Sequence, residues 1–214
     1  MNELQLPTNG VGYRICKRLL DLVLSIALLP FVLIAVALVA ISVKLSSPGP
    51  IFYRHTRIGL GKKQFDLWKF RTMIHEGDRI FWNHLAQSAE ARQEWLCYRK
   101  LKHDPRVTRV GAFLRRSNLD ELPQILNVLQ GDMSLVGPRP IVEEELRRYG
   151  AGSALYTAVL PGITGLWQVS GRGCLPYEKR VALDVEYVST WSLARDFVVL
   201  TKTLNAAWSC RGAF

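Results

Sequence analysis

The chain has 214 residues, which is enough for one domain with a sizeable core and short for two. Lys and Arg outnumber Asp and Glu by 28 to 18, and this net charge of +10 indicates an anionic partner: nucleic acid, a membrane surface or a phosphate-rich substrate. The four cysteines and four histidines show no metal-ligand spacing, so the composition argues against a disulfide framework and a zinc site.

The first predicted element is an apolar run from Leu22 to Val43, which contains no charged residue. As a helix it would reach about 33 Å, enough to cross a bilayer. Pro30 would kink or break this helix, and basic residues flank the run on both sides, so neither end is marked for the far face. We therefore favour a helix that enters the membrane, breaks near Pro30 and returns to the same face. One ordinary transmembrane helix is the alternative.

The segment after the apolar run is predicted to form a β-hairpin. The sequence Ser-Pro-Gly-Pro at 47–50 is a helix breaker that ends the membrane segment. Residues 51–53 and 64–70 are rich in aromatic and apolar side chains and are predicted strands. A glycine-containing turn at 59–62 would join them.

Three helices are predicted further along the chain. The first covers residues 80–101. The second covers residues 120–130 and ends at Gly131, because apolar residues recur there with helical spacing: Leu122, Ile125, Leu126 and Leu129. The third carries an apolar stripe that is typical of a core-facing helix, although it could instead lie on a membrane surface: Leu193, Phe197, Leu200, Leu204 and Trp208.

Two adjacent carboxylates, Asp120 and Glu121, stand at the expected start of the second helix. There the helix dipole would lower the pKa of the carboxyl groups and keep them ionised. An ionised Asp can ligate a metal, attack phosphorus, or simply favour a first helical turn. Asn118 and Glu121 even fit a capping box, so the pair alone does not decide among these roles.

Basic residues surround this pair in the sequence. They are concentrated in residues 54–71 and 99–116 and recur in two later loops. Arginine suits phosphate because its planar fork binds two oxygens. Several such groups around an acidic pair suggest a diphosphate with a Mg²⁺ ion on Asp120 and Glu121. The candidates are Lys69, Arg71, Arg115, Arg116, Arg139 and Arg172.

Five stretches in order resemble the bacterial sugar transferases, the monotopic polyprenol-phosphate phosphoglycosyltransferases. They are SPGPIFY at 47–53, WKFRTM at 68–73, LDELPQ at 119–124, GDMSLVGPRP at 131–140 and PGITGLWQVSGR at 161–172. The resemblance runs from about Lys17 to the C-terminus. Within the family the chain is most similar to undecaprenyl-phosphate galactose phosphotransferases, which begin exopolysaccharide or O-antigen repeat units.

The resemblance implies an α+β, mainly helical fold. Residues 1–46 would form an N-terminal tail and a re-entrant helix-break-helix segment in the bacterial inner membrane. Residues 47–214 would form a small catalytic domain on the cytoplasmic face, with a short β-hairpin and amphipathic interfacial helices. Many relatives carry Ser-Pro at the membrane break, whereas this chain has Leu29-Pro30.

The resemblance also implies a reaction. A hexose-1-phosphate, expected to be galactose-1-phosphate, would pass from a UDP-sugar to undecaprenyl phosphate with release of UMP. Asp120 would form a covalent aspartyl-phosphosugar, and Glu121 would complete the acidic dyad. Further expected partners are membrane lipid, a second copy of the chain in a homodimer and downstream glycosyltransferases. Nucleic acid is not an expected partner. The expected substrate and phosphate contacts are Lys69, Arg71, Arg115, Arg139, Gln168 and Arg172.

Two other functions stay open on the residues alone. A basic, membrane-tethered nucleic-acid-binding protein would account for the charge, although the sequence has no helix-turn-helix, zinc or RNA-binding signature. A non-catalytic membrane scaffold would account for the apolar run.

Overall fold

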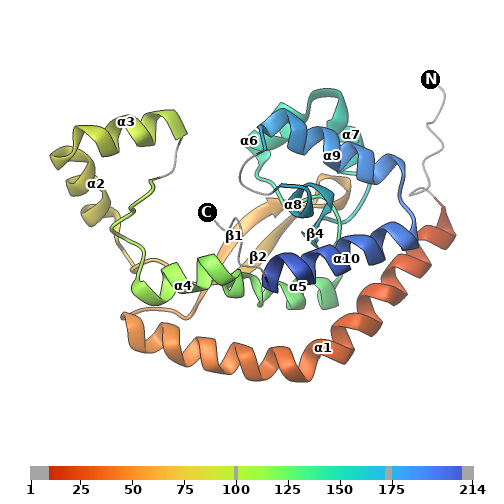
Figure 1. The fold of residues 1–214 in the computed structure, drawn as a ribbon, viewed down its shortest axis with the longest axis horizontal. Coiled ribbons are helices and arrows are strands. Elements are labelled where there is room, and N and C mark those ends of the chain that lie inside the picture. Colours follow the sequence, from red (N-terminus) through yellow and green to blue (C-terminus); the bar gives the residue numbers. More distant parts are fainter. Residues whose placement is uncertain (1–9, 99–100, 172–174, 209–214) are drawn as a thin grey trace.

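The computed structural model describes residues 10–98, 101–171 and 175–208. One long apolar helix lies along a mainly helical domain with two small sheets (Figure 1), which confirms the predicted α+β class. The first half contains α1 (Val11–Ser46), β1 (Phe52–Ile58), η2 (Leu60–Lys62), β2 (Gln64–Phe70), α2 (Asp78–Gln87), α3 (Ala89–Tyr98) and α4 (Arg109–Ser117). The second half contains η3 (Leu119–Glu121), α5 (Gln124–Gln130), β3 (Ser134–Val136), α6 (Glu143–Leu146), η4 (Arg147–Gly152), α7 (Ser153–Tyr156), β4 (Gly162–Thr164), α8 (Leu166–Val169), α9 (Tyr177–Ser189) and α10 (Leu193–Trp208).

Helix α1 is long and apolar enough to cross a membrane, and most of its apolar side chains are exposed. It is continuous through Pro30, so the predicted interruption of the helix at this residue is wrong. The helix instead bends about midway and follows the underside of the domain (Figure 1). A proline inside a helix removes one backbone hydrogen bond and permits such a bend without ending the helix.

The first half of α1 is fixed to the domain by polar contacts. Lys17 Nζ lies 2.6 Å from Asp196 Oδ2 of α10, and both side chains are buried. Arg18 donates to the carbonyl oxygens of Val128 and Leu129 at the end of α5. Asp21 Oδ1 accepts from the hydroxyl and backbone groups at the start of β3. These buried partners commit the start of α1 to one position against the domain.

The second half of α1 contacts the same domain. Val39 and Val43 pack against Phe70 of β2 and Leu114 of α4. The guanidinium group of Arg71 donates to the carbonyl oxygens at the end of the helix, those of Val43, Ser47 and Pro48. Because the last carbonyls of a helix have no intrahelical partner, Arg71 closes α1 and holds it to the hairpin.

Strands β1 and β2 form the predicted antiparallel hairpin. Tyr53 is opposite Lys69, His55 is opposite Leu67, and Arg57 is opposite Phe65. Residues directly opposite each other in such a pair point to the same face of the sheet. One face of the hairpin therefore carries Phe65 and Leu67 into the main core and presents Lys69 at its end.

The main core joins the hairpin, the second sheet and the C-terminal helices. Strands β3 and β4 are parallel, with Ser134 opposite Gly162. Asn127 of α5 ties this helix to β2, because its side-chain amide donates to the carbonyl of Asp66 and accepts from the backbone N–H of Trp68. The buried members of this core are Phe65, Leu67, Ile125, Val128, Met133, Leu135, Val136, Val159, Tyr187, Val188 and Val199.

The prediction of one continuous helix over residues 80–101 is wrong, because the chain forms two helices there, α2 and α3, which separate at Ser88. The hydroxyl of Ser88 accepts from the backbone N–H of Ala91 and so begins a second helix. The helix predicted over residues 120–130 is also divided: η3 is a 3₁₀ turn, and α5 begins only after Pro123. The predicted end of this helix at Gly131 is confirmed, since Gly131 has φ of 90° and its backbone N–H donates to two carbonyls at the end of α5.

Most of the described part of the predicted apolar stripe on α10 is exposed, so the favoured interpretation of a core-facing stripe holds only at Leu200, which packs against the main core. The side chain of Trp208 lies outside the described residues. Leu193, Phe197 and Leu204 are 40%, 53% and 71% exposed. The face turned inward instead carries Asp196 and Val199, both fully buried. An exposed apolar face on a helix is what an interfacial helix requires.

Candidate active site

Asp120 and Glu121 lie in the 3₁₀ turn η3, between α4 and α5. Asn118 has φ of 56° and reverses the chain at the end of α4. Its side chain makes no capping hydrogen bond, so the predicted capping box is wrong. The turn instead presents two adjacent carboxylates toward the end of β2, where Lys69 lies.

Glu121 is held by two cations. Lys69 Nζ lies 2.6 Å from Glu121 Oε1, and Arg139 Nη2 lies 3.3 Å from the same oxygen. Lys69 also approaches Asp120, at 4.0 Å from Oδ2. The side chains of Lys69, Asp120 and Glu121 are each less than 20% exposed, whereas that of Arg139 is 40% exposed. The cluster is thus partly sheltered from water, which strengthens its ionic interactions.

The two carboxyl groups differ in acidity. Burial would raise the pKa of Glu121, but Arg139 and Lys69 outweigh it and lower this pKa to about 2. Burial raises the pKa of Asp120, and the negative charge of Glu121 adds to the rise, against the influence of Lys69 and Arg115. The prediction that a helix dipole lowers the pKa of Asp120 is therefore wrong, because a single 3₁₀ turn offers little dipole while burial removes water. Glu121 is the firmly ionised member of the pair.

Arg115 is brought to the cluster by the close packing of α4 on the end of the hairpin. A side chain at Gly111 would collide with the backbone carbonyl of Thr72, so only glycine permits this approach. Arg115 Nε then donates to Thr72 Oγ1 at 2.9 Å. Burial lowers the pKa of Arg115, and the nearby charge of Asp120 opposes this change. Arg115 therefore contributes positive charge on the side of Asp120.

Arg139 reaches the cluster from a rigid loop. Its carbonyl accepts from the buried hydroxyl of Tyr156, and the neighbouring Pro138 carbonyl accepts from Gly162 N. A side chain at Gly162 would collide with the backbone of Gly137, so the two loops meet at glycines. Lys69, Arg115 and Arg139, which are distant in sequence, thus surround one acidic pair.

The remaining candidate residues lie elsewhere. Arg71 is 7% exposed, and its guanidinium group donates to the carbonyls that end α1, so the structure gives it a structural position in place of the expected phosphate contact. Gln168 Nε2 on α8 donates to the carbonyl of Ile163, while its buried Oε1 has no partner among the described residues. Arg172 lies outside the described residues.

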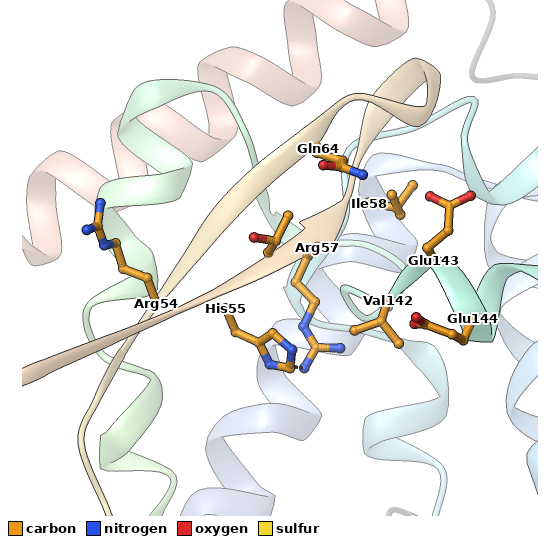
Figure 2. A pocket seen from close by; sticks show the side chains of 9 residues that line it. Arg54, His55, Arg57, Ile58, Gln64, Val142, Glu143 and Glu144 are labelled. Atoms are coloured by element: carbon orange, nitrogen blue, oxygen red, sulfur yellow. Dashed lines mark hydrogen bonds between the residues drawn. The ribbon is translucent and has the colours of Figure 1, made fainter. Parts of the chain in front are cut away.

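Sequence reasoning missed two residues beside the cluster, His55 and Arg57. Both lie on the face of the hairpin that carries Lys69, as the strand pairing shows. They line a cleft of about 370 Å³ together with Glu143 and Glu144 (Figure 2). The signal that could have found them is the alternation of side chains in a hairpin, which puts residues 53, 55 and 57 on the same face as residues 65, 67 and 69.

The donor set at the acidic pair suits a metal only together with a substrate. The described residues contain no group of three His, Cys, Asp or Glu side chains that could hold a metal ion. Asp120 and Glu121 supply two adjacent carboxylates, and one oxygen of Glu121 is already engaged by Lys69 and Arg139. Mg²⁺ binds through one or two carboxylates and completes its coordination with phosphates and water, so these residues fit that ion.

Known proteins resemble this chain over nearly its whole length. The profile of the bacterial sugar transferases matches residues 12–209. The chain is 45% identical over 208 residues to the exopolysaccharide production protein ExoY of Sinorhizobium fredii, covering 97% of this chain and 90% of that protein. It is 44% identical to the undecaprenyl-phosphate galactose phosphotransferase of Salmonella typhimurium, covering 94% of this chain and 42% of the relative.

A further relative is the UDP-glucose:undecaprenyl-phosphate glucose-1-phosphate transferase of Escherichia coli, which is 40% identical and matches 97% of this chain and 43% of its own length. The matches to these relatives cover nearly the whole chain, so they include both the apolar helix and the acidic pair. The chain belongs to the bacterial sugar transferase family and is a phosphoglycosyl transferase.

Proposed function

We propose that this enzyme transfers a hexose-1-phosphate from a UDP-sugar to undecaprenyl phosphate and releases UMP, with galactose as the expected hexose. The observation that carries the proposal is the acidic pair enclosed by Lys69, Arg115 and Arg139. Such a cluster suits a diphosphate that must be attacked by an anion, because the cations offset the charge that both partners bring. The names of the Salmonella and Escherichia relatives specify galactose and glucose respectively.

In the first step, a carboxylate oxygen of Asp120 attacks the phosphorus that carries the sugar. A P–O bond forms to Asp120, and the bond from that phosphorus to the bridging oxygen breaks. The bridging oxygen leaves with the electron pair as part of UMP. Lys69 and Arg115 lie beside Asp120 and offset the charge that accumulates on the phosphoryl oxygens. Glu121 holds Lys69 and Arg139 in place for this step.

In the second step, a phosphate oxygen of undecaprenyl phosphate attacks the same phosphorus. The bond to Asp120 breaks, the carboxylate is regenerated, and the sugar leaves as a diphosphate-linked lipid. Burial favours this exchange, because water that reached the acyl phosphate would hydrolyse it. The small exposed fraction of Asp120 supports a route in which the covalent intermediate is protected.

Mg²⁺ is part of the proposal and would be held by Asp120 and Glu121. When bound, it would neutralise negative charge on the diphosphate of the donor. We expect EDTA-treated enzyme to lose transfer activity and to regain it on addition of Mg²⁺. Activity that persists after complete removal of divalent ions would contradict the metal assignment.

We also propose that α1 is re-entrant and that the domain lies on the cytoplasmic face of the inner membrane. Residues 17–21 near the start of α1 and residues 39–47 near its end both contact the one domain. A helix that crossed the bilayer would place one of these segments about 30 Å from a domain on the other side. The bend of α1 (Figure 1) supports the return of both ends to one face.

Cysteine accessibility tests this topology. In a chain whose native cysteines are serines, Gly12→Cys and Leu45→Cys lie near the two ends of α1. Both should react with a membrane-impermeant thiol reagent only after the inner membrane is opened. Reaction of only one of them in intact spheroplasts would show that α1 crosses the membrane.

The transfer reaction is tested by release of UMP from UDP-galactose in the presence of undecaprenyl phosphate. Asp120→Asn should abolish release, whereas Asp132→Asn should retain it. With radiolabelled UDP-galactose and no lipid, the wild-type protein should retain labelled sugar phosphate and Asp120→Asn should not. Full activity of Asp120→Asn would overturn the nucleophile, and a panel of UDP-sugars would identify the hexose.

A further inference from the structure

The cleft beside the acidic pair is formed by β1 on one side and by the segment that leads into α6 on the other. His55 and Arg57 project into it from the strand, and Val142, Glu143 and Glu144 border the opposite side (Figure 2). Its volume of about 370 Å³ falls in the range of small-molecule sites.

The segment that follows Arg139 links the proposed catalytic cluster to the cleft. Ile58, at the end of β1, donates its backbone N–H to the carbonyl of Ile141. The segment 139–144 therefore runs along the hairpin, with Arg139 directed at Glu121 and Glu143 lining the cleft. The strand pairing places His55 and Arg57 on the same face as Lys69.

Arg57 is a cation without a carboxylate partner among the described residues. Its Nη2 lies 3.1 Å from His55 Nδ1, and its Nε is buried without a hydrogen bond among those residues. Burial lowers the pKa of Arg57, and the positive charge of Arg139 lowers it further. Burial also lowers the pKa of His55, as do Arg57 and Lys69, so His55 is suited to accept a hydrogen bond from Arg57 as a neutral imidazole. Arg57 and Arg139 are therefore two positive charges near each other, and such a pair favours an anion between them.

Glu143 and Glu144 give the cleft a different chemistry on its other side. Their carboxylates make no salt bridge within 4 Å in the described part of the chain. Ionised carboxylates accept hydrogen bonds from hydroxyl groups. A ligand with a phosphate at one end and neighbouring hydroxyls at the other therefore matches the cleft.

We propose that this cleft binds the leaving nucleoside monophosphate, with Arg57 donating to its phosphate and Glu143 and Glu144 accepting from its ribose hydroxyls. This inference rests on the proposed function. The attacking and leaving oxygens are roughly in line across the transferred phosphoryl group, so the leaving phosphate lies away from Asp120. Lys69 and Arg115 are the cations near Asp120, whereas Arg139 is the cation near Arg57. Arg139 thus lies between the two phosphate positions.

The first test measures equilibrium binding of UMP to the full-length enzyme in detergent. Arg57→Gln should weaken UMP binding about tenfold or more and raise the KM for the UDP-sugar similarly, since a charge-assisted hydrogen bond is lost. The KM for undecaprenyl phosphate should stay unchanged. Arg57→Lys, which keeps the charge and the fold but lacks the planar fork, should give an intermediate loss.

Arg54→Gln is the matched control. Arg54 is three residues away at the rim of the same cleft, but it points away from His55 and Arg57 (Figure 2). It lies 3.7 Å from Asp66 and over the ring of Trp68 on the opposite face of the hairpin. Arg54→Gln should therefore weaken UMP binding far less than Arg57→Gln does.

The second test compares UMP with 2′,3′-dideoxy-UMP. Glu143→Gln and Glu144→Gln together should weaken binding of UMP and leave binding of the dideoxy analogue unchanged. A wild-type protein that releases UMP while Arg57→Gln binds it normally would overturn this inference and leave the transfer reaction intact. A wild-type protein that neither binds nor releases UMP would instead overturn the proposed function. A change in hexose preference without a change in UMP binding would assign the two glutamates to the sugar and contradict the ribose contact.

Discussion

Lys69 Nζ lies 2.6 Å from Oε1 of Glu121, closer than it lies to the proposed nucleophile. The acidic pair is therefore asymmetric. Glu121 binds the cations and has a pKa lowered to about 2, whereas Asp120 is 4.0 Å from Lys69 and has a raised pKa. This arrangement keeps Lys69 near Asp120 without a close ion pair that would occupy the attacking oxygen.

The ion pair between Lys69 and Glu121 should act as one unit in catalysis. Glu121→Gln frees the ammonium group to pair with Asp120, and Lys69→Met removes a charge that stabilises the phosphoryl oxygens. We expect each substitution to lower kcat for UMP release by about 100-fold or more. The double variant should be no slower than the slower single variant, because residues that act together give non-additive losses.

The control for this cycle is Lys63→Met, which removes an exposed lysine from the same hairpin and should leave kcat unchanged. Losses that simply multiply in the double variant would show that Lys69 and Glu121 contribute independently. Thermal unfolding of each variant should be followed in parallel, so that a loss of folded protein is not taken for a loss of catalysis.

Arg71 should support the fold and not substrate binding. Its guanidinium group donates to three carbonyls at the end of α1, and hydrogen bonds from a charged donor contribute about 1.5–3 kcal/mol each. Arg71→Ala should lower the free energy of unfolding by about 3–6 kcal/mol, because two of the three hydrogen bonds, those to Ser47 and Pro48, are short. The KM for the UDP-sugar should stay unchanged. Arg71→Lys should not restore stability, because an ammonium group cannot reproduce the fork.

Thermal unfolding in detergent and steady-state kinetics measure these two properties separately. A variant at position 71 that unfolds like the wild type but has a raised KM for the UDP-sugar would return Arg71 to the phosphate contacts expected from the family resemblance.

The contrast between Lys69 and Arg71 shows where sequence reasoning succeeds and where it ends. Both were candidate phosphate contacts from one basic stretch. The predicted strand over residues 64–70 is confirmed, and it includes Lys69. Arg71 lies just beyond the strand, where alternation no longer fixes its direction, and the carbonyls that end α1 decide its position. No local pattern could reveal that the end of a distant helix would meet it.

The acidic pair shows the same limit. The sequence predicts its place at the start of an apolar helix, but not the form of the backbone. Pro123 lacks the N–H that a continuous helix would use, and the chain forms a 3₁₀ turn in which Leu122 N bonds to Leu119 O. The raised pKa of Asp120 follows from burial by distant segments, which apolar periodicity does not report.

The buried ion pair between Lys17 and Asp196 should be needed to attach α1 to α10. The distance is 2.6 Å, and Tyr187 and Trp191 also donate to Asp196. Lys17→Met should lower the free energy of unfolding by about 3–5 kcal/mol, because it leaves a buried negative charge without its cation. Combining Lys17→Met with Asp196→Asn should recover part of the loss.

Chemical denaturation in detergent would measure these changes, with Lys44→Met as the control near the other end of α1. Lys44 is exposed, so its removal should change stability by less than about 0.5 kcal/mol. A double variant less stable than either single variant would show that the two charges do not depend on each other.

Asp184 should make the stability of the domain depend on pH. The side chain is buried on α9, where Tyr149 donates to Oδ2 at 2.8 Å and Oδ1 has no partner among the described residues. Burial raises the pKa of Asp184 to about 7, against the hydrogen bond from Tyr149 and the charge of Arg139. Between roughly pH 4 and pH 7 the unfolded chain has lost this proton while the folded chain retains it, so stability falls as the pH rises through this window.

Asp184→Asn removes this penalty because the amide has no proton to lose and its oxygen can still accept from Tyr149. The temperature of unfolding of Asp184→Asn relative to the wild type should therefore increase from pH 4 to pH 8. The rise in the pKa of Asp184 to about 7 corresponds to a stability difference of about 4 kcal/mol at the upper end of this pH range. Glu178→Gln, an exposed position on the same helix, should follow the wild-type curve at every pH. Parallel curves for Asp184→Asn and the wild type would mean that Asp184 is ionised in the folded protein and is balanced by Arg139.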